Sequence, residues 1–165
     1  MFSLALRVSA TTNEFITMNV HCYNAVLNAA AFTDGGMDAR TEAFNIATTT
    51  LEELLKSKEV DPISSTFGTY IKVCGKLSLP RTVVEPAVSK AFDQFRDLGL
   101  VNDFILTQVR YSVSPAQYRN LLGDVTKGKK INERLIINEI PHAWRKNVGE
   151  RLPNSGNKSH WWKHE

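Results

Sequence analysis

Two stretches, YNAVLNAAAFT at residues 23–33 and FGTYIKVCGKL at residues 67–77, share a pattern that decides the fold of this chain. They lie 44 residues apart, and their matched positions are Tyr23 with Phe67, Leu27 with Ile71, and Ala30 with Cys74. Positions at i, i+4 and i+7 fall on one face of an α-helix. The pattern therefore predicts an aromatic-led amphipathic helix that the chain uses twice, as repeat proteins do.

A second pair of matching stretches follows these predicted helices. Residues 47–54 (ATTTLEEL) match residues 88–95 (VSKAFDQF) at an offset of 41 residues. Each unit then contains a helix, a connection and a second helix, so a helical hairpin is repeated. We expect the matched apolar side chains to be buried between layers: Tyr23, Leu27, Leu51, Leu54, Phe67, Ile71, Phe92 and Phe95.

Turn and capping residues delimit the predicted helices. The Asp-Gly-Gly run at residues 34–36 indicates a turn between the first two helices, and Gly99 indicates a helix end. The hydroxyl groups of residues 64–66 (SST) are candidates for the N-cap of the second copy.

A third, shorter unit begins with residues 104–112 (FILTQVRYS). Ser114 and Gln117 have the spacing of a capping box, with Pro115 at the first helical position. The apolar stretch at residues 131–140 fits either a short helix or a strand. We therefore predict an all-α fold: an α-solenoid of helix-turn-helix repeats, with two full repeats, a partial third and an irregular carboxyl-terminal tail.

These signals divide the chain into three parts. Residues 1–19 are either the end of an upstream helix or part of a targeting sequence, residues 20–123 are the repeat region, and residues 124–165 are a basic, partly disordered tail. Residues 1–123 hold 11 Lys and Arg against 12 Asp and Glu, whereas the tail holds 9 against 5. The basic excess of the tail is either a phosphate-binding feature or a solvated terminus.

Composition and motifs argue against several classes of protein. No stretch approaches the roughly eighteen apolar residues of a membrane-spanning helix, so we expect no membrane partner. Two cysteines without a C-x-x-C pair, and His160 and His164 without a third ligand, lead us to expect no metal and no cofactor. The sequence has no phosphate loop or nucleophile motif, so we expect no catalytic residues, no small-molecule substrate and no enzyme.

The repeat units resemble pentatricopeptide repeats. Residues 20–29 (VHCYNAVLNA) resemble the opening V-x-T-Y-N-x-L-I-x-A of such a repeat, and residues 62–76 (PISSTFGTYIKVCGK) resemble the passage from one repeat to the next. Residues 51–54 (LEEL) and 92–95 (FDQF) are similar to the F-E-E-M end of the second helix, and residues 140–148 are similar to the end of some algal members. The resemblance covers residues 20–123, with units of 44 and 40 residues, longer than is usual.

The resemblance implies a set of RNA-binding residues. In this family a first-helix residue and the last residue of the same repeat read one base of single-stranded RNA. Carried onto this chain, the readers are Asn24 with Ile63, Gly68 with Asp103, and Gln108 in the third unit. Asn24 offers a donor and an acceptor, whereas Gly68 and Ile63 offer no side-chain hydrogen bond, so each complete pair keeps one reading group.

Phosphate contacts would come from basic residues near these readers. Lys72 lies four residues after Gly68, on the same helical face, and Lys76 follows one turn later.

Two functions of different class use this architecture. One is binding of single-stranded RNA in organellar processing, stability or translation, in a mitochondrion or plastid as the resemblance implies. The other is a scaffold for protein partners, cytoplasmic if the family signal does not apply.

Overall fold

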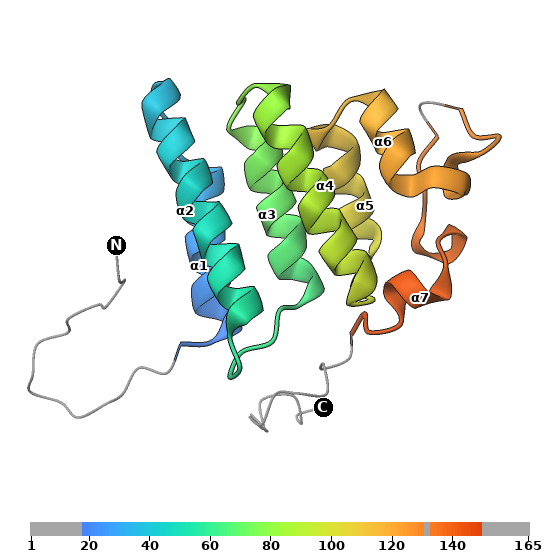
Figure 1. The fold of residues 1–165 in the computed structure, drawn as a ribbon, viewed down its shortest axis with the longest axis horizontal. Coiled ribbons are helices and arrows are strands. Elements are labelled where there is room, and N and C mark those ends of the chain that lie inside the picture. The colour runs from blue at the N-terminus through green and yellow to red at the C-terminus, as the bar shows by residue number, and fades with distance from the viewer. Residues whose placement is uncertain (1–17, 131–132, 150–165) are drawn as a thin grey trace, which may run out of the picture.

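The computed structural model describes residues 18–130 and 133–149, and all regular structure within them is helical (Figure 1). This confirms the predicted all-α class. The helices are α1 Val20–Ala31, α2 Met37–Lys56, α3 Ser64–Lys76, α4 Arg81–Asp97, α5 Asp103–Ser112, α6 Pro115–Leu122 and the short α7 His142–Arg145. Two 3₁₀ turns accompany them, η1 Gly123–Thr126 and η2 Ile137–Glu139. Within the described ranges, no helix combines the length and apolar character needed to cross a membrane.

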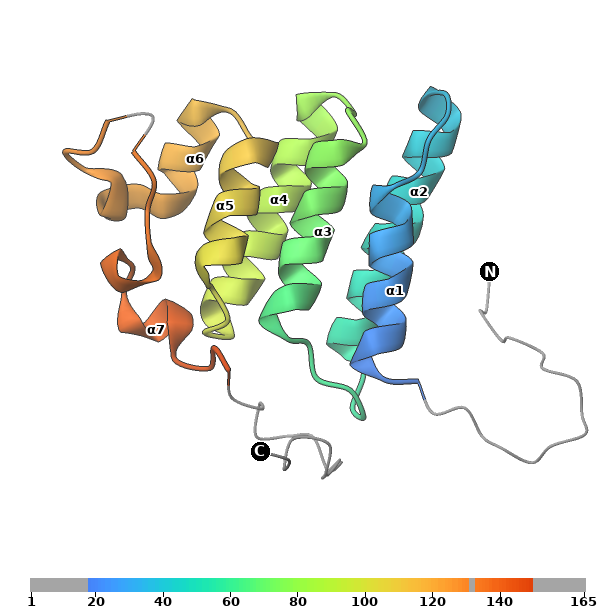
Figure 2. The same cartoon turned by 180° about the vertical axis from the view of Figure 1, so that it is seen from behind.

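The helices form antiparallel hairpins in two layers. α1 pairs with α2 and α3 pairs with α4, while α3 also packs along both α1 and α5. Seen from behind, α1, α3 and α5 lie side by side in one layer, with α2 and α4 in the other (Figure 2). α6 contacts both α4 and α5. α3 is therefore the central helix, with a neighbour on each side in its own layer and α2 and α4 behind it.

The core lies between these layers. Seven of the eight side chains expected there are at most 4% exposed: Leu27, Leu51, Leu54, Phe67, Ile71, Phe92 and Phe95. The rings of Phe67 and Phe95 are in direct contact, which joins α3 to α4. The prediction for Tyr23 is wrong, because this side chain is only half-buried. α1 is the first helix of its layer and has a packing neighbour on one side only among the described residues.

Capping contacts confirm some predicted boundaries and correct one. The Ser114 hydroxyl accepts the N–H of Gln117 at 3.2 Å, and α4 ends just before Gly99, whose φ of 68° favours glycine. The N-cap prediction for residues 64–66 is wrong. Ile63 holds the N-cap position, so these hydroxyl groups lie inside the first turn, where Thr66 accepts the N–H of Ile63 at 3.4 Å.

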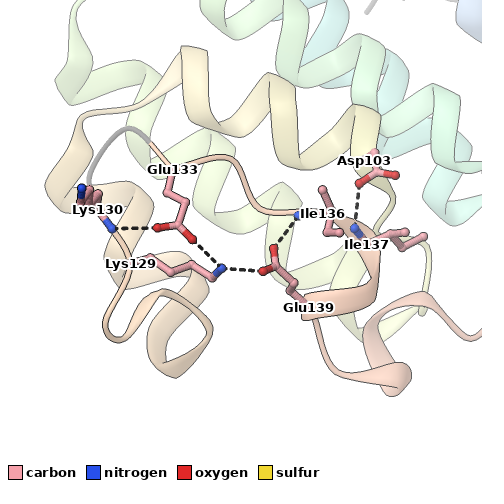
Figure 3. A network of polar contacts seen from close by, with 7 residues as sticks. All are labelled: Asp103, Lys129, Lys130, Glu133, Ile136, Ile137 and Glu139. Atoms are coloured by element: carbon pink, nitrogen blue, oxygen red, sulfur yellow. Dashed lines mark hydrogen bonds and ion pairs between the residues drawn. The ribbon is translucent and has the colours of Figure 1, made fainter.

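The stretch at residues 131–140 is neither a regular helix nor a strand in its described part. An extended segment leads into the η2 turn, and its apolar side chains Leu135 and Ile140 are buried. The Asp103 carboxylate accepts the N–H of Ile137 at 2.7 Å (Figure 3). This contact holds the returning chain at the start of α5, so the apolar pattern reflects burial against α5 and not a regular element.

Residues 144–147 also pack onto the helices, although we predicted an irregular tail from residue 124 onward. The ring of Trp144 meets that of Phe92 edge-on, with centroids 5.9 Å apart. Val101 donates its N–H to the Trp144 carbonyl at 2.8 Å, and Asn147 donates its N–H to the Gly99 carbonyl at 2.9 Å. The folded unit thus extends well beyond residue 123. The predictions for residues 1–17 and 150–165, including the two histidines, lie outside the described residues.

Two phenylalanines of equal size provide a matched test of this core. Phe92 is completely buried, whereas Phe32 is 60% exposed. We expect Phe92→Ala to lower the free energy of unfolding by about 3–5 kcal/mol, because it leaves a cavity, and Phe92→Leu to lower it by less. Phe32→Ala should lower it by only about 1 kcal/mol, because it removes contacts of an exposed ring and leaves no cavity. Urea denaturation followed by circular dichroism measures both, and equal losses at the two positions would contradict the two-layer core.

Candidate functional site

The helices α1, α3 and α5 present a row of partly or fully exposed side chains that we call the first-helix face. These helices stand in front in Figure 2. The members of the face recur mostly at intervals of three or four residues, so they lie on one side of each helix. They are Asn24, Asn28 and the C-cap Phe32 of α1, Ser65, Lys72 and Lys76 of α3, and Phe104, Gln108 and Tyr111 of α5.

Side chains of α1 and α3 meet across this face. The amide nitrogen of Asn24 donates to the Ser65 hydroxyl at 3.5 Å, and the Lys72 ammonium donates to the Asn28 amide oxygen at 3.4 Å. The amide oxygen of Asn24 is buried and has no hydrogen-bond partner among the described residues. Asn24, the predicted reader of the first repeat, is therefore turned toward α3, and it must rotate to offer both of its polar groups to a base.

The two predicted phosphate-binding lysines gather around one exposed aromatic ring. The ammonium groups of Lys72 and Lys76 each lie 4.5 Å from the ring centroid of Phe32. This distance is within the range of a cation–π contact, which at an exposed site contributes about 0.5–1 kcal/mol. Phe32 was not among the predicted site residues. Its signal in the sequence is its position, four residues after Asn28 and eight after Asn24 on the same helix face.

The predicted second reader, Gly68, is buried beneath another aromatic ring. A Cβ atom at this position would lie 2.2 Å from two ring carbons of Phe104. The side chain of Phe104 is itself 40% exposed, so part of it remains at the surface. The place where a base-reading side chain would leave α3 is therefore occupied by an aromatic group from α5.

The remaining predicted readers have mixed environments. Ile63 is a half-buried N-cap residue, and the Asp103 carboxylate is engaged by the backbone of Ile137. Gln108 is half-buried on the same side of α5 as Phe104 and Tyr111, and Tyr111 is 78% exposed. The structure thus brings Asn24, Lys72, Lys76 and Gln108 onto one face, while Gly68, Ile63 and Asp103 have packing or backbone contacts of their own.

Charge is divided unequally between the two layers. The helices α1, α3 and α5 carry three basic residues and one acidic residue, a net charge of +2, and α1 and α3 contain no acid at all. The helices α2 and α4 carry five basic and seven acidic residues, a net charge of −2. The potential therefore favours an anion on the side of the first-helix face and disfavours one on the opposite side.

The chemistry available on the first-helix face is stacking, cation contact and hydrogen bonding. Exposed aromatic faces stack on planar rings, and lysines attract phosphate. The buried Cys74 lies in the core beneath this face, and burial raises the pKa of its thiol to about 12, so it remains protonated at neutral pH. In residues 18–130 and 133–149, no three His, Cys, Asp or Glu side chains gather in a way that could hold a metal ion.

Comparison of the chain with models of known protein families, with curated proteins and with solved structures finds no match.

The contact between Gly68 and Phe104 can be tested by a double-mutant cycle. We expect Gly68→Ala to lower the free energy of unfolding by about 1 kcal/mol, because a steric cost of about 1–3 kcal/mol outweighs the gain of about 1 kcal/mol in helix propensity. In a Phe104→Ala background, Gly68→Ala should raise the free energy of unfolding by about 1 kcal/mol, since the obstructing ring is gone. The same effect of Gly68→Ala in both backgrounds would show that the two residues are not coupled.

Proposed function

We propose that this chain is a short α-solenoid that binds single-stranded RNA through its first-helix face. The observation that carries the proposal is the ring of Phe32, 60% exposed, with the ammonium groups of Lys72 and Lys76 over it. Proteins that bind single strands combine aromatic platforms for bases with basic groups for the backbone. This cluster provides both on neighbouring helices.

The rest of the face supports the same function. Phe104 and Tyr111 are exposed aromatics on α5, and Asn24 and Gln108 contribute amides that can pair with base edges. A duplex hides the faces of its bases, so a row of aromatics favours a single strand. The positive net charge on this side, against the negative charge of α2 and α4, favours a polyanion.

The family resemblance extends the proposal to a biological setting. Pentatricopeptide repeat proteins act on organellar transcripts, so we place this chain in RNA processing, stability or translation in a mitochondrion or plastid. The proposed role is binding and not catalysis. A scaffold for protein segments is the competing function, and it would be favoured by an acidic or wholly apolar face. The absence of acids from α1 and α3 weighs against it.

Binding of labelled RNA, followed by fluorescence anisotropy at two salt concentrations, tests the proposal. We expect an unstructured strand to bind more tightly than a duplex of the same sequence. Phe32→Ala should weaken binding of the strand by about 5- to 100-fold, because stacking on an aromatic ring contributes about 1–3 kcal/mol per base. The pair Lys72→Gln and Lys76→Gln should lower the salt slope by about 1.4, since each phosphate contact to a single strand accounts for about 0.7.

The matched control is the pair Lys56→Gln and Lys58→Gln, which removes two exposed lysines outside the first-helix face. It should leave the affinity and the salt slope nearly unchanged. Equal affinity for strand and duplex, or no binding at low salt, would reject the RNA proposal in favour of the scaffold. If both lysine pairs lowered affinity equally, the attraction would come from overall charge and not from this face.

A further inference from the structure

A basic hollow lies beyond the first-helix face, where α5, α6 and the segment after η1 meet. Its volume is about 210 Å³, roughly that of seven water molecules. Its lining includes four basic residues, Arg110, Arg119, Lys129 and Lys130, and the single acid Glu133. The lining therefore carries an excess of positive charge, and the hollow is large enough for a phosphate group with part of its sugar.

Two carboxylates contact Lys129, and no ion pair engages Arg119 or Lys130 among the described residues. The Lys129 ammonium contacts the carboxylates of Glu133 and Glu139, and these hydrogen bonds raise its pKa (Figure 3). Glu133 also accepts the backbone N–H of Lys130 at 3.3 Å. The side chains of Arg119 and Lys130 make no ion pair with another described residue, and both are exposed. Counting Glu139, four bases face two acids, so a net positive charge remains.

A phenol group completes the lining. Tyr118 is 8% exposed and lines the hollow. Burial raises the pKa of its hydroxyl, while the charges of Arg110 and Lys129 act in the opposite direction. The group is therefore a neutral donor at neutral pH, within the influence of the charges of Arg110 and Lys129. Tyr118 and Arg119 thus add a hydroxyl and a guanidinium, both hydrogen-bond donors, to the residues that line the hollow.

The hollow adjoins the end of the first-helix face. A smaller hollow of about 60 Å³ shares Arg110 and Tyr118 with it and reaches Tyr111, a member of that face. Within the described residues, the segment around Leu135 and Ile137 packs along α5. α5 is therefore the last helix of the layer that α1, α3 and α5 form. A strand that follows the face from α1 to α5 therefore arrives at the basic hollow where the layer ends.

We propose that this basic hollow binds the terminal phosphate group of an RNA strand whose bases lie on the first-helix face. The inference rests on the proposed RNA-binding function. A terminal phosphate has a charge of about −1.5 to −2 at neutral pH and three strong acceptor oxygens. An internal phosphate diester has one charge, so a cluster of cations favours the end of a strand. Arginine suits this role because its planar guanidinium forms two parallel hydrogen bonds with phosphate oxygens.

Three oligonucleotides of one unstructured sequence test the proposal on the full chain: one with a 5′-phosphate, one with a 3′-phosphate and one with hydroxyl groups at both ends. We expect one of the phosphorylated strands to bind about tenfold more tightly than the hydroxyl strand. The pair Arg119→Gln and Lys130→Gln should abolish this preference, and the control pair Lys56→Gln and Lys58→Gln should retain it. Phe32→Ala should weaken all three strands alike and leave the ratio unchanged.

Other outcomes distinguish the proposed terminal-phosphate site from the proposed RNA binding by the first-helix face. Equal affinity for all three strands would overturn the terminal-phosphate site and leave the RNA-binding function in place. Failure of every strand to bind would overturn both. Inorganic phosphate, followed by phosphorus NMR line broadening, forms the second arm. If it binds in a way that depends on Arg119 and Lys130 while the strands show no end preference, the hollow holds a small free phosphate and the proposal is wrong.

Discussion

The close approach of α3 and α5 is the contact on which the rest of the structure depends. It requires glycine at two positions of α3 that lie two turns apart. A Cβ atom at Gly68 would strike the ring of Phe104, and one at Gly75 would lie 2.5 Å from the Ser112 hydroxyl. With these helices close together, the Ser112 hydroxyl donates to the Ile71 carbonyl at 3.0 Å and so joins a side chain of α5 to the backbone of α3. Small residues at a helix interface permit this separation because no side chain stands between the axes.

That packing also determines the character of the first-helix face. Because Phe104 fits over Gly68, an aromatic ring from α5 covers a position that the family resemblance assigns to a reading side chain. The face is consequently richer in aromatic surface and poorer in hydrogen-bonding groups than the resemblance alone implies. Such a surface suits sequence-tolerant stacking more than recognition of base edges, since every base has a face and only some edges match a given amide.

The carboxyl-terminal segment completes the fold where the last hairpin is short. α6 has only eight residues and leaves the flank of α5 open beyond its end. Leu135, Ile140 and Trp144 cover this flank and the end of α4, and the backbone bonds at Gly99 and Val101 hold them there. We expected the basic residues of this segment either to bind phosphate or to lie in a solvated terminus, and two of them, Lys129 and Lys130, line a defined hollow. A segment without helical periodicity can still be part of the folded domain when its apolar residues pack against the side of a helix.

Helical periodicity and turn chemistry were sufficient to predict the hairpins, most of their boundaries and seven of eight core residues. Turns and caps follow from contacts within a few residues, and the spacing of apolar residues marks the side of each helix that packs. Ser114 and Gly99 show this for caps, and Leu51 and Phe92 show it for the core. Tyr23 could not be placed from its pattern, because burial depends on whether a neighbouring helix packs there. The same holds for the cluster of Phe32, Lys72 and Lys76, the ring over Gly68 and the basic hollow. Each joins residues about 20 to 45 positions apart, or depends on a returning segment, so only the tertiary packing of separate helices brings them together.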